Sequence, residues 1–181
     1  MIRRLEDTER DLALAIVNDA AVAYADAIPP DRYHIPYMDR AYLDGEIAAG
    51  VEFFAYDAAA DDTVGSLAEI LGVMGIQEVG DVTLVRHAYV RATAQRGGIG
   101  SALLAHVRAL ATRPVLVGTW AAATWAVGFY QRNGFSLVSP AEKDRLLQTY
   151  WSIPARQVET SVVLADQRAL REIVRGSGVA R

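Results

Sequence analysis

The chain has 181 residues, of which 52% are hydrophobic and 22% charged, and this composition is that of a folded globular protein rather than a disordered one. The formal net charge of −4 at pH 7 disfavours a nucleic-acid partner, because binding to phosphate backbones requires an excess of basic residues. The sequence contains no cysteine, which excludes disulfides, thiolate metal ligands and a cysteine nucleophile.

The N-terminal region indicates neither export nor membrane insertion. The first ten residues, MIRRLEDTER, carry charges with no apolar stretch directly after them, so we expect no signal peptide. The most apolar early run, residues 12–28, is interrupted by Asn18 and Asp19 and is too short to cross a bilayer. We therefore expect a cytoplasmic protein with no membrane partner, folded as one domain over residues 1–181.

The first quarter of the chain predicts a short strand and two helices. The strand is expected at residues 2–5, and apolar residues at three- and four-residue spacing predict a helix over residues 8–23. Two prolines, at 29–30, end this helix and open a loop that reaches the second helix, expected over residues 39–49. The ring-bearing side chains of that loop are Tyr33, His34 and Tyr37.

The rest of the chain alternates between strands and helices. Strands are expected at residues 51–56, 70–79, 81–90, 115–120, 135–138 and 157–165. Helices are expected at residues 99–110, 122–132, 141–151 and 166–174. A connection of small and polar residues at 57–66 makes the first two of these strands an antiparallel hairpin, and the tail from Gly176 is expected to fray. This alternation predicts an α/β fold with a mixed sheet and helices on both faces.

Residues 88–107, AYVRATAQRGGIGSALLAHV, predict a buried strand, a glycine-rich turn and the start of a helix. Free backbone N–H groups at the positive end of a helix dipole suit a diphosphate, and Gly98 and Gly100 would let a ligand approach the backbone. The same pattern is compatible with a plain turn before a helix. A P-loop would need Gly-Lys-Ser/Thr here, and a dinucleotide-binding turn would lie in the first strand–helix unit with a third glycine.

Two segments carry a resemblance to the GNAT superfamily of acyl-CoA-dependent N-acyltransferases. Residues 95–100, QRGGIG, match the family pattern of Gln or Arg, two residues, Gly, one residue, and Gly or Ala. Residues 129–135, FYQRNGF, match its Phe/Leu-Tyr-x-x-x-Gly-Phe signature. The resemblance implies the GNAT fold, which is a mixed sheet of about seven strands flanked by helices on both faces.

The resemblance also implies an acyl-CoA co-substrate, with backbone groups at the end of the central strand pairing with the pantetheine arm and loop amides holding the pyrophosphate. The implied binding residues are Tyr89, Val90, Gln95, Arg96, Gly97, Gly98, Gly100 and Ser101. Two departures from the family pattern are visible. Ala92 stands where the family often has proline, which would weaken the rigidity of the turn, and Ala123 stands where an asparagine often contacts CoA.

By the same resemblance, Tyr130 is the general acid that protonates the departing thiolate. A phenol with a pKa of about 10 is reasonably matched to a thiol with a pKa of about 8.5. The alternative is a tyrosine that only packs within its helix.

No general base follows from the sequence. The acid–base residues on the central strand of the family match Leu84 and Arg86, and neither is a base. The amine must therefore lose its proton to water or to a residue elsewhere. The candidates are Glu52, Glu78, Asp81, His87 and Glu159. Strand alternation predicts that His87 lies on the face opposite Arg86, where we interpret it as a satisfied core histidine.

Arg86 lies within an otherwise apolar strand and needs an anionic partner. Two interpretations are open: a salt bridge with Glu52 or Glu159, or a carboxylate on the acceptor substrate. The resemblance implies that the loop between the first two helices covers the acceptor site. The expected substrate-binding residues are Arg86, Trp120, Tyr33, His34 and Tyr37.

The sequence thus predicts an N-acetyltransferase that moves the acetyl group of acetyl-CoA directly to a primary amine of a small molecule, with a carboxylate-bearing amine as one candidate. Without cysteine to carry the acetyl group, direct transfer is favoured over an acyl-enzyme route. No metal is expected, and a homodimer is left open. The alternative is a non-catalytic acyl-CoA-binding sensor or interaction module, which the lack of a base at positions 84 and 86 favours.

Overall fold

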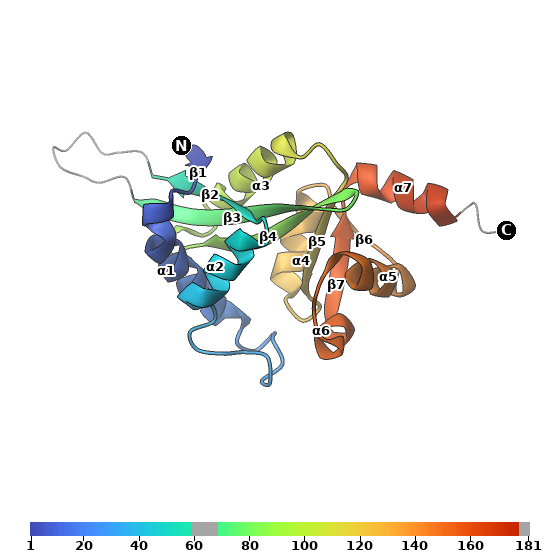
Figure 1. The fold of residues 1–181 in the computed structure, drawn as a ribbon, viewed down its shortest axis with the longest axis horizontal. Helices are drawn as coiled ribbons and strands as arrows, with labels where there is room; N and C mark the ends of the chain where they lie inside the picture. The colour runs from blue at the N-terminus through green and yellow to red at the C-terminus, as the bar shows by residue number, and fades with distance from the viewer. Residues whose placement is uncertain (59–68, 178–181) are drawn as a thin grey trace.

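Seven strands form one mixed sheet in the computed structural model, which describes residues 1–58 and 69–177 (Figure 1). The strand order is β1-β2-β3-β4-β5-β7-β6, and β4 and β5 are the parallel pair within an otherwise antiparallel sheet. The strands are β1 Ile2–Arg4, β2 Glu52–Asp57, β3 Ile70–Val79, β4 Val82–Val90, β5 Val115–Trp120, β6 Ser136–Leu137 and β7 Ser161–Ala165. The predicted α/β fold class is confirmed.

Helices cover both faces of this sheet. On one face lie α1, α2 and α5, and on the other lie α3 and α4, while α7 extends from the edge near the C-terminus (Figure 1). The helices are α1 Arg10–Ala21, α2 Arg40–Ala48, α3 Ile99–Leu110, α4 Thr124–Arg132, α5 Pro140–Tyr150, α6 Ala155–Thr160 and α7 Gln167–Ser177, with short 3-10 turns η1 Asp7–Glu9, η2 Val22–Tyr24 and η3 Ala92–Ala94.

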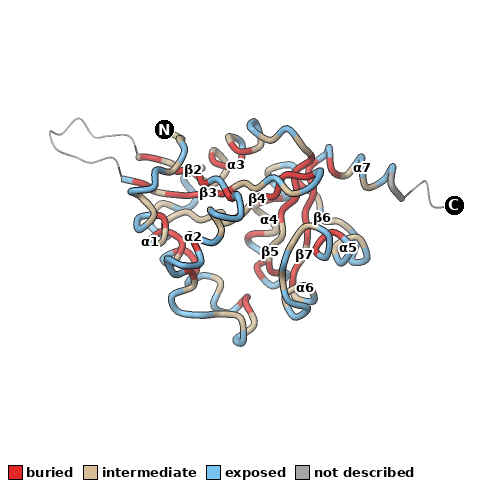
Figure 2. The backbone as a smooth tube through the Cα atoms, viewed as in Figure 1, coloured by how far each residue is buried: buried red, intermediate tan, exposed pale blue. Residues whose placement is uncertain are grey.

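The apolar core lies between the sheet and these helices, and Figure 2 shows the buried residues concentrated along the strands. Alternate residues of β4 face opposite layers, so Leu84 packs towards α5 and Val85 towards α3. Helix α3 lies close to β3 at Gly72 because this residue has no side chain. A Cβ built there would lie 3.1 Å from the Ile99 side chain and 3.2 Å from that of Leu103. This packing fixes where α3 begins, and with it the position of the glycine turn.

One expected element is wrong in part. Residues 157–165 were expected to form a single strand, but residues 157–160 belong to α6 and only Ser161–Ala165 form β7. The β5 partner ends at Trp120, opposite Ser161, so residues before Ser161 have no strand to pair with. Pro154 precedes α6 with φ −67° and starts a helical turn instead. Most of the predicted 57–66 connection, and the tail after 177, lie outside the described residues.

The sheet opens between β4 and β5. Thr83–Val85 of β4 pair with Val115–Val117 of β5. Beyond these residues β4 pairs only with β3, and β5 pairs only with β7. In the same place β4 has an extra residue, since His87 and Ala88 lie opposite the single residue Met74 of β3. This β-bulge bends the strand away from β5. Beyond the separation, the end of β4 faces α4, the helix that follows β5, across a cavity.

Candidate active site

The turn after β4 is shaped by backbone conformation. Arg96 has φ +65° and Gly98 has φ +83°, both in the left-handed region, and α3 begins directly after Gly98. The amides of the first helical turn have no partner within the helix and point out of its N-terminus. The Gln95 side chain donates to the Val90 carbonyl at 3.1 Å, which closes the turn onto the end of β4. The loop therefore presents N–H groups to the opening between the strands.

A tie from α1 supports this turn at the position where the family often has proline. The amide of Ala92 donates to the Asp19 carboxylate at 2.8 Å. Proline has no N–H and could not make this bond. Ala92 was expected to weaken the rigidity of the turn, but the bond to Asp19 restrains it by another route.

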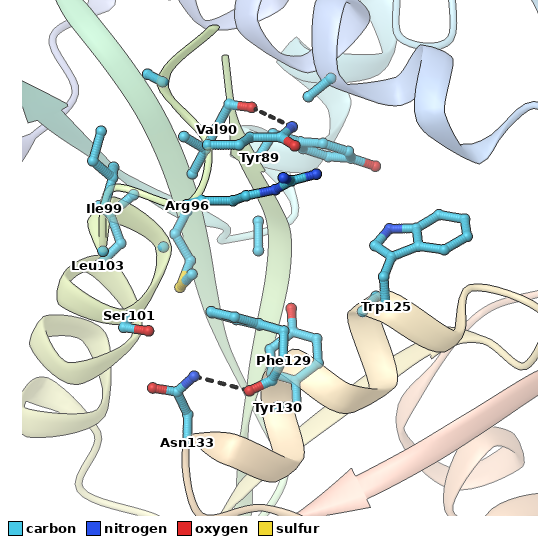
Figure 3. Close-up of a pocket in the computed structure, with 18 of the residues that line it drawn as sticks. Tyr89, Val90, Arg96, Ile99, Ser101, Leu103, Trp125, Phe129, Tyr130 and Asn133 are labelled. Atoms are coloured by element: carbon cyan, nitrogen blue, oxygen red, sulfur yellow. Dashed lines mark hydrogen bonds between the residues drawn. The ribbon is translucent and has the colours of Figure 1, made fainter. Parts of the chain in front are cut away.

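A cavity of about 800 Å³ occupies the opening between β4 and α4 (Figure 3). Most residues predicted to bind CoA line it, and so does the predicted acid. These are Tyr89, Val90, Gln95, Arg96, Gly98, Gly100, Ser101 and Tyr130. Gly97 is exposed within the same loop and does not line the cavity. The lack of a side chain at Gly100 allows α3 and α4 to lie close together, since a Cβ built there would be only 3.3 Å from the Phe129 ring.

Tyr130 projects from α4 into this cavity beside Phe129 (Figure 3). Its exposed fraction is 7%, and its ring contacts Phe129 and Phe135 edge to face. Burial raises the pKa of Tyr130 well above the ordinary value for a phenol, and the nearby Tyr24 adds to the shift. Tyr130 is therefore protonated at neutral and alkaline pH and available as a hydrogen-bond donor.

Several aromatic residues that the sequence analysis did not assign to the site surround Tyr130. Tyr24, at the end of η2, and Trp125, in the first turn of α4, both line the cavity. Their ring centroids lie 5.4 Å apart in an edge contact, and the ring centroids of Tyr24 and Tyr89 lie 6.1 Å apart in a second edge contact. Helical spacing could have identified Trp125, because it lies four residues before Phe129 and so on the same face of α4.

Arg86 is held by an internal carboxylate. Its guanidinium donates to Glu46 of α2 at 2.6 Å and to Gln77 of β3 at 2.5 Å. The predicted partners Glu52 and Glu159 are therefore wrong. Arg86 does not line the cavity, and the pairing removes the free guanidinium that a carboxylate-bearing acceptor would need.

His87 binds the same carboxylate, with its Nε2 2.6 Å from Glu46. The prediction that His87 faces away from Arg86 is wrong, because the bulge gives His87 a φ of +50° and interrupts the alternation of side chains. The imidazole stacks on Phe53 at 5.7 Å. Burial acts to raise the pKa of Glu46, but the hydrogen bond from His87 and the charge of Arg86 outweigh it and lower that pKa.

The other candidate bases are bound elsewhere. Each lies outside the cavity and contacts a neighbour: Glu52 pairs with Arg4, Glu78 with Arg113, Asp81 with Tyr150 and Glu159 with Arg156. Among residues 1–58 and 69–177, those that line the cavity include no carboxylate and no histidine. The site thus supplies phenol groups but no ordinary base.

The predicted acceptor-side residues separate into two groups. Trp120, Tyr33 and Tyr37 pack in one apolar cluster with Ala123, so they lie together next to the cavity. Tyr37 also contacts Tyr89, with ring centroids 6.2 Å apart. His34 is exposed and is not part of this cluster. Ala123, which replaces the family asparagine, is fully buried there.

Within residues 1–58 and 69–177, no three His, Asp or Glu side chains form a group able to hold a metal ion. No helix in that part of the chain is long and apolar enough to span a membrane.

Comparison with known families gives one match by sequence. Residues 41–137, more than half of the chain, match the acetyltransferase (GNAT) domain family. This range includes the bulge, the glycine turn and the Tyr130 segment. No curated protein is detectably similar in sequence.

Solved structures share the fold at low sequence identity. PaiA N-acetyltransferase from Thermoplasma acidophilum, in complex with coenzyme A, has a TM-score of 0.66 at 12% identity and covers 92% of this chain and 97% of its own. Ribosomal-protein-alanine N-acetyltransferase from Brucella melitensis has a TM-score of 0.57 at 20% identity, over 77% of this chain and 86% of its own. N-acetylglutamate synthase from Neisseria gonorrhoeae, with coenzyme A and N-acetyl-glutamate, has a TM-score of 0.58 at 18% identity, over 93% of this chain and 35% of its own.

Proposed function

Because the chain belongs to the GNAT acetyltransferase family and is therefore an acyltransferase, we propose that it transfers the acetyl group of acetyl-CoA directly to a primary amine of a small molecule. The observation that supports this most strongly is that the glycine turn and Tyr130 line the same cavity. An acyl donor held by the turn at its diphosphate would extend along β4 towards that hydroxyl.

The polar part of the cavity suits the diphosphate of CoA. Amides at the N-terminus of α3 and the dipole of that helix favour an anion. Arg96 and Arg132 line the same cavity and add positive charge. The structures of PaiA N-acetyltransferase and N-acetylglutamate synthase contain coenzyme A, which fits this assignment.

The reaction proposed is a direct displacement on the thioester carbonyl. The amine nitrogen forms the new C–N bond, the C–S bond breaks, and the electron pair leaves on the CoA sulfur. Tyr130 donates a hydrogen bond to that sulfur as its charge develops and passes its proton to the thiolate; because burial raises the pKa of Tyr130 well above that of a thiol, this transfer is favourable only when the phenolate regains a proton from water in the same step. The proton lost by the amine goes to water.

The lack of a lining base is compatible with this reaction. Moving an ammonium into a cavity without a carboxylate disfavours its charged form and lowers the pKa of the amine. The substrate then reacts as a neutral amine that has left its proton in solution. A primary amine has a pKa near 10.4, so the rate should rise with pH across the neutral range.

The test is to incubate the protein with acetyl-CoA and a panel of amines, measuring released CoA thiol and identifying products by mass spectrometry. One acetylated amine formed for each thiol released supports the proposal. A stable acetyl-protein species that passes its acetyl group to the amine would contradict direct transfer.

A second candidate is a protein that binds acyl-CoA without turnover. It is favoured by the absence of a carboxylate and a histidine from the cavity lining. Tight CoA binding by calorimetry, slow thioester hydrolysis and no acetylated amine from the panel would select it.

A further inference from the structure

The cavity has two ends of different chemistry. We call the turn at residues 95–101, with Arg132 and Asn133, the polar end, and Tyr24, Tyr89 and Trp125 the aromatic end. Figure 3 shows Ser101 and Asn133 on one side of Tyr130, and Trp125 with the Tyr89 ring on the other. If the donor diphosphate occupies the polar end, the aromatic end is left for the acceptor.

The aromatic end is built from three segments that are distant in sequence. The Tyr24 ring contacts Tyr89 at 6.1 Å and Trp125 at 5.4 Å, so it bridges β4 and α4. This contact between Trp125 and Tyr24 joins α4 to η2. Behind Tyr89, the Tyr37 ring supports it from the loop between α1 and α2.

The phenols of this end line the same cavity as the predicted acid. Burial raises the pKa of Tyr24 to about 12, and Tyr89 is shifted upward by burial and by the nearby Tyr37 and Tyr24. These groups are neutral at physiological pH and offer apolar ring surface with hydroxyl groups at its edge.

The described residues that line the cavity include two cations and no carboxylate. The cations there are Arg96, in the turn assigned to the diphosphate, and Arg132, in the last turn of α4. Arg86 is taken by Glu46. Figure 3 shows the Arg96 side chain extending beside the Tyr89 ring, so this cation lies between the two ends, whereas the aromatic end offers no carboxylate to hold a second ammonium.

Trp125 is half exposed, with an exposed fraction of 47%, although indole is among the most favourable side chains to bury. It stands at the cavity and not in the core, and its ring is already fixed by Tyr24. A ligand in the cavity could cover part of this ring, with no other change in the fold.

We propose that the acceptor is a monoamine with an aromatic or large apolar body, bound at the aromatic end with its nitrogen towards Tyr130, and that Trp125 determines this specificity. The inference rests on the proposed function and names the substrate class for the same site. Polyamines are a poor fit, since their second ammonium finds no carboxylate among the described lining residues, and an amino acid would have to compete with the donor diphosphate for Arg96.

Three amines test the proposal: 2-phenylethylamine, L-glutamate and putrescine, each with acetyl-CoA. The wild-type protein should show the largest kcat/KM with 2-phenylethylamine. Trp125→Leu should raise the KM for this amine roughly five- to tenfold, because one aromatic contact and its covered area are lost, and leave the KM for acetyl-CoA within about twofold. Leu110→Ala is the matched control, since Leu110 has a similar exposed fraction, 48%, at the far end of α3. This control should behave as wild type.

A greater kcat/KM with L-glutamate or putrescine would overturn the proposal, and so would an unchanged KM for 2-phenylethylamine in Trp125→Leu. Calorimetry separates this failure from failure of the proposed function. N-acetyl-2-phenylethylamine, the product, is titrated into the protein with CoA present, and N-acetylglutamate serves as the comparison. Selective binding of the aromatic amide that weakens in Trp125→Leu supports the acceptor class even if no amine is turned over, whereas no preference between the two amides overturns it.

Discussion

The polar end and the aromatic end of the cavity differ in how the chain builds them. The polar end comes from one continuous stretch, β4 to α3, and its recognition groups are backbone amides held by the left-handed conformations of Arg96 and Gly98. The aromatic end comes from η2, β4 and α4, and its recognition groups are side chains. A backbone site depends on the conformation of a few residues, whereas a side-chain site changes with each substitution.

This difference has a consequence for specificity. Backbone amides at a helix N-terminus bind any diphosphate of suitable shape, so the polar end can serve many related enzymes unchanged. Rings from separate segments can be replaced one at a time, and the acceptor class can change without disturbing the donor site. Tyr130 lies between the two ends, and a change there should therefore affect the reaction more than the binding of either substrate.

Replacing Tyr130 by Phe gives the largest expected effect. The ring keeps its contacts with Phe129 and Phe135, and only the hydroxyl is lost. Loss of a general acid typically lowers kcat about 10²- to 10⁴-fold. Steady-state kinetics with saturating acceptor measures this, and the Kd for CoA by calorimetry should stay unchanged.

The pH profile adds a second check on Tyr130. Its pKa is raised, so the acid stays protonated as the amine loses its proton, and kcat/KM should rise with pH without a falling limb up to about pH 10. A falling limb below pH 9 would contradict this assignment, as would wild-type turnover in Tyr130→Phe.

Glu46→Gln probes the bulge that separates β4 from β5. Glu46 joins α2 to Arg86 and His87, and the substitution leaves Arg86 partly buried without a counter-charge. We expect the free energy of unfolding at pH 7 to fall by about 2 kcal/mol, less than for a fully buried pair because Gln still accepts a hydrogen bond. Urea denaturation of both proteins measures the difference.

The pH dependence of that difference follows from the lowered pKa of Glu46. A carboxyl with a depressed folded-state pKa contributes stability above its unfolded pKa of about 4.3, and this contribution is lost as pH falls through the folded value. The gap between wild type and Glu46→Gln should therefore shrink below about pH 4. A gap that stays constant from pH 7 to pH 3 would show that the charge of Glu46 does not stabilise the bulge.

Gly98→Val tests the polar end alone. Gly98 has φ +83°, and no heavy atom lies within 4 Å of a Cβ built there, so the cost comes from backbone strain and from blocking the ligand's approach. A left-handed conformation costs roughly 1–2 kcal/mol for a residue with a side chain, and the Kd for CoA should rise about tenfold or more. Gly45→Ala, in the open interior of α2, is the control for glycine replacement and should bind CoA as wild type does. Equal CoA affinity in Gly98→Val would remove the phosphate role of the turn.

Local sequence predicted the fold class and the polar end because both are encoded over short distances. Gly98 marks a turn whose left-handed conformation few other residues adopt, and the alternation of strands and helices fixes the layers. The Glu46 pairing with Arg86 could not be predicted in this way, since the partners lie 40 positions apart and meet only after α2 has packed on the sheet.

The same reasoning explains the other differences. His87 was placed on the wrong face because strand alternation assumes a regular ladder, and a single extra residue in β4 breaks it. Tyr24 was missed because it lies just beyond the predicted helix over residues 8–23, and nothing local indicates a contact with Trp125, about 100 residues later. Side-chain sites assembled from several segments are specified by tertiary packing, and this is why the acceptor half was harder to predict than the donor half.

The smallest expected effect concerns Asp19, which ties the polar end to the helix that carries the aromatic end. Its carboxylate accepts from the Ala92 amide at 2.8 Å, and the same helix leads into η2 and Tyr24. The bond is exposed, so its loss in Asp19→Ala should cost little stability but loosen the turn before α3. We expect the Kd for CoA to rise about threefold, measured by calorimetry beside Asp26→Ala, an exposed acidic residue beyond η2 that serves as the charge control. If Asp19→Ala and Asp26→Ala bind CoA alike, the bond to Ala92 does not restrain the turn. If Asp19→Ala also raises the KM for the acceptor, the two ends are coupled through α1, and a change at the donor site then does affect acceptor binding.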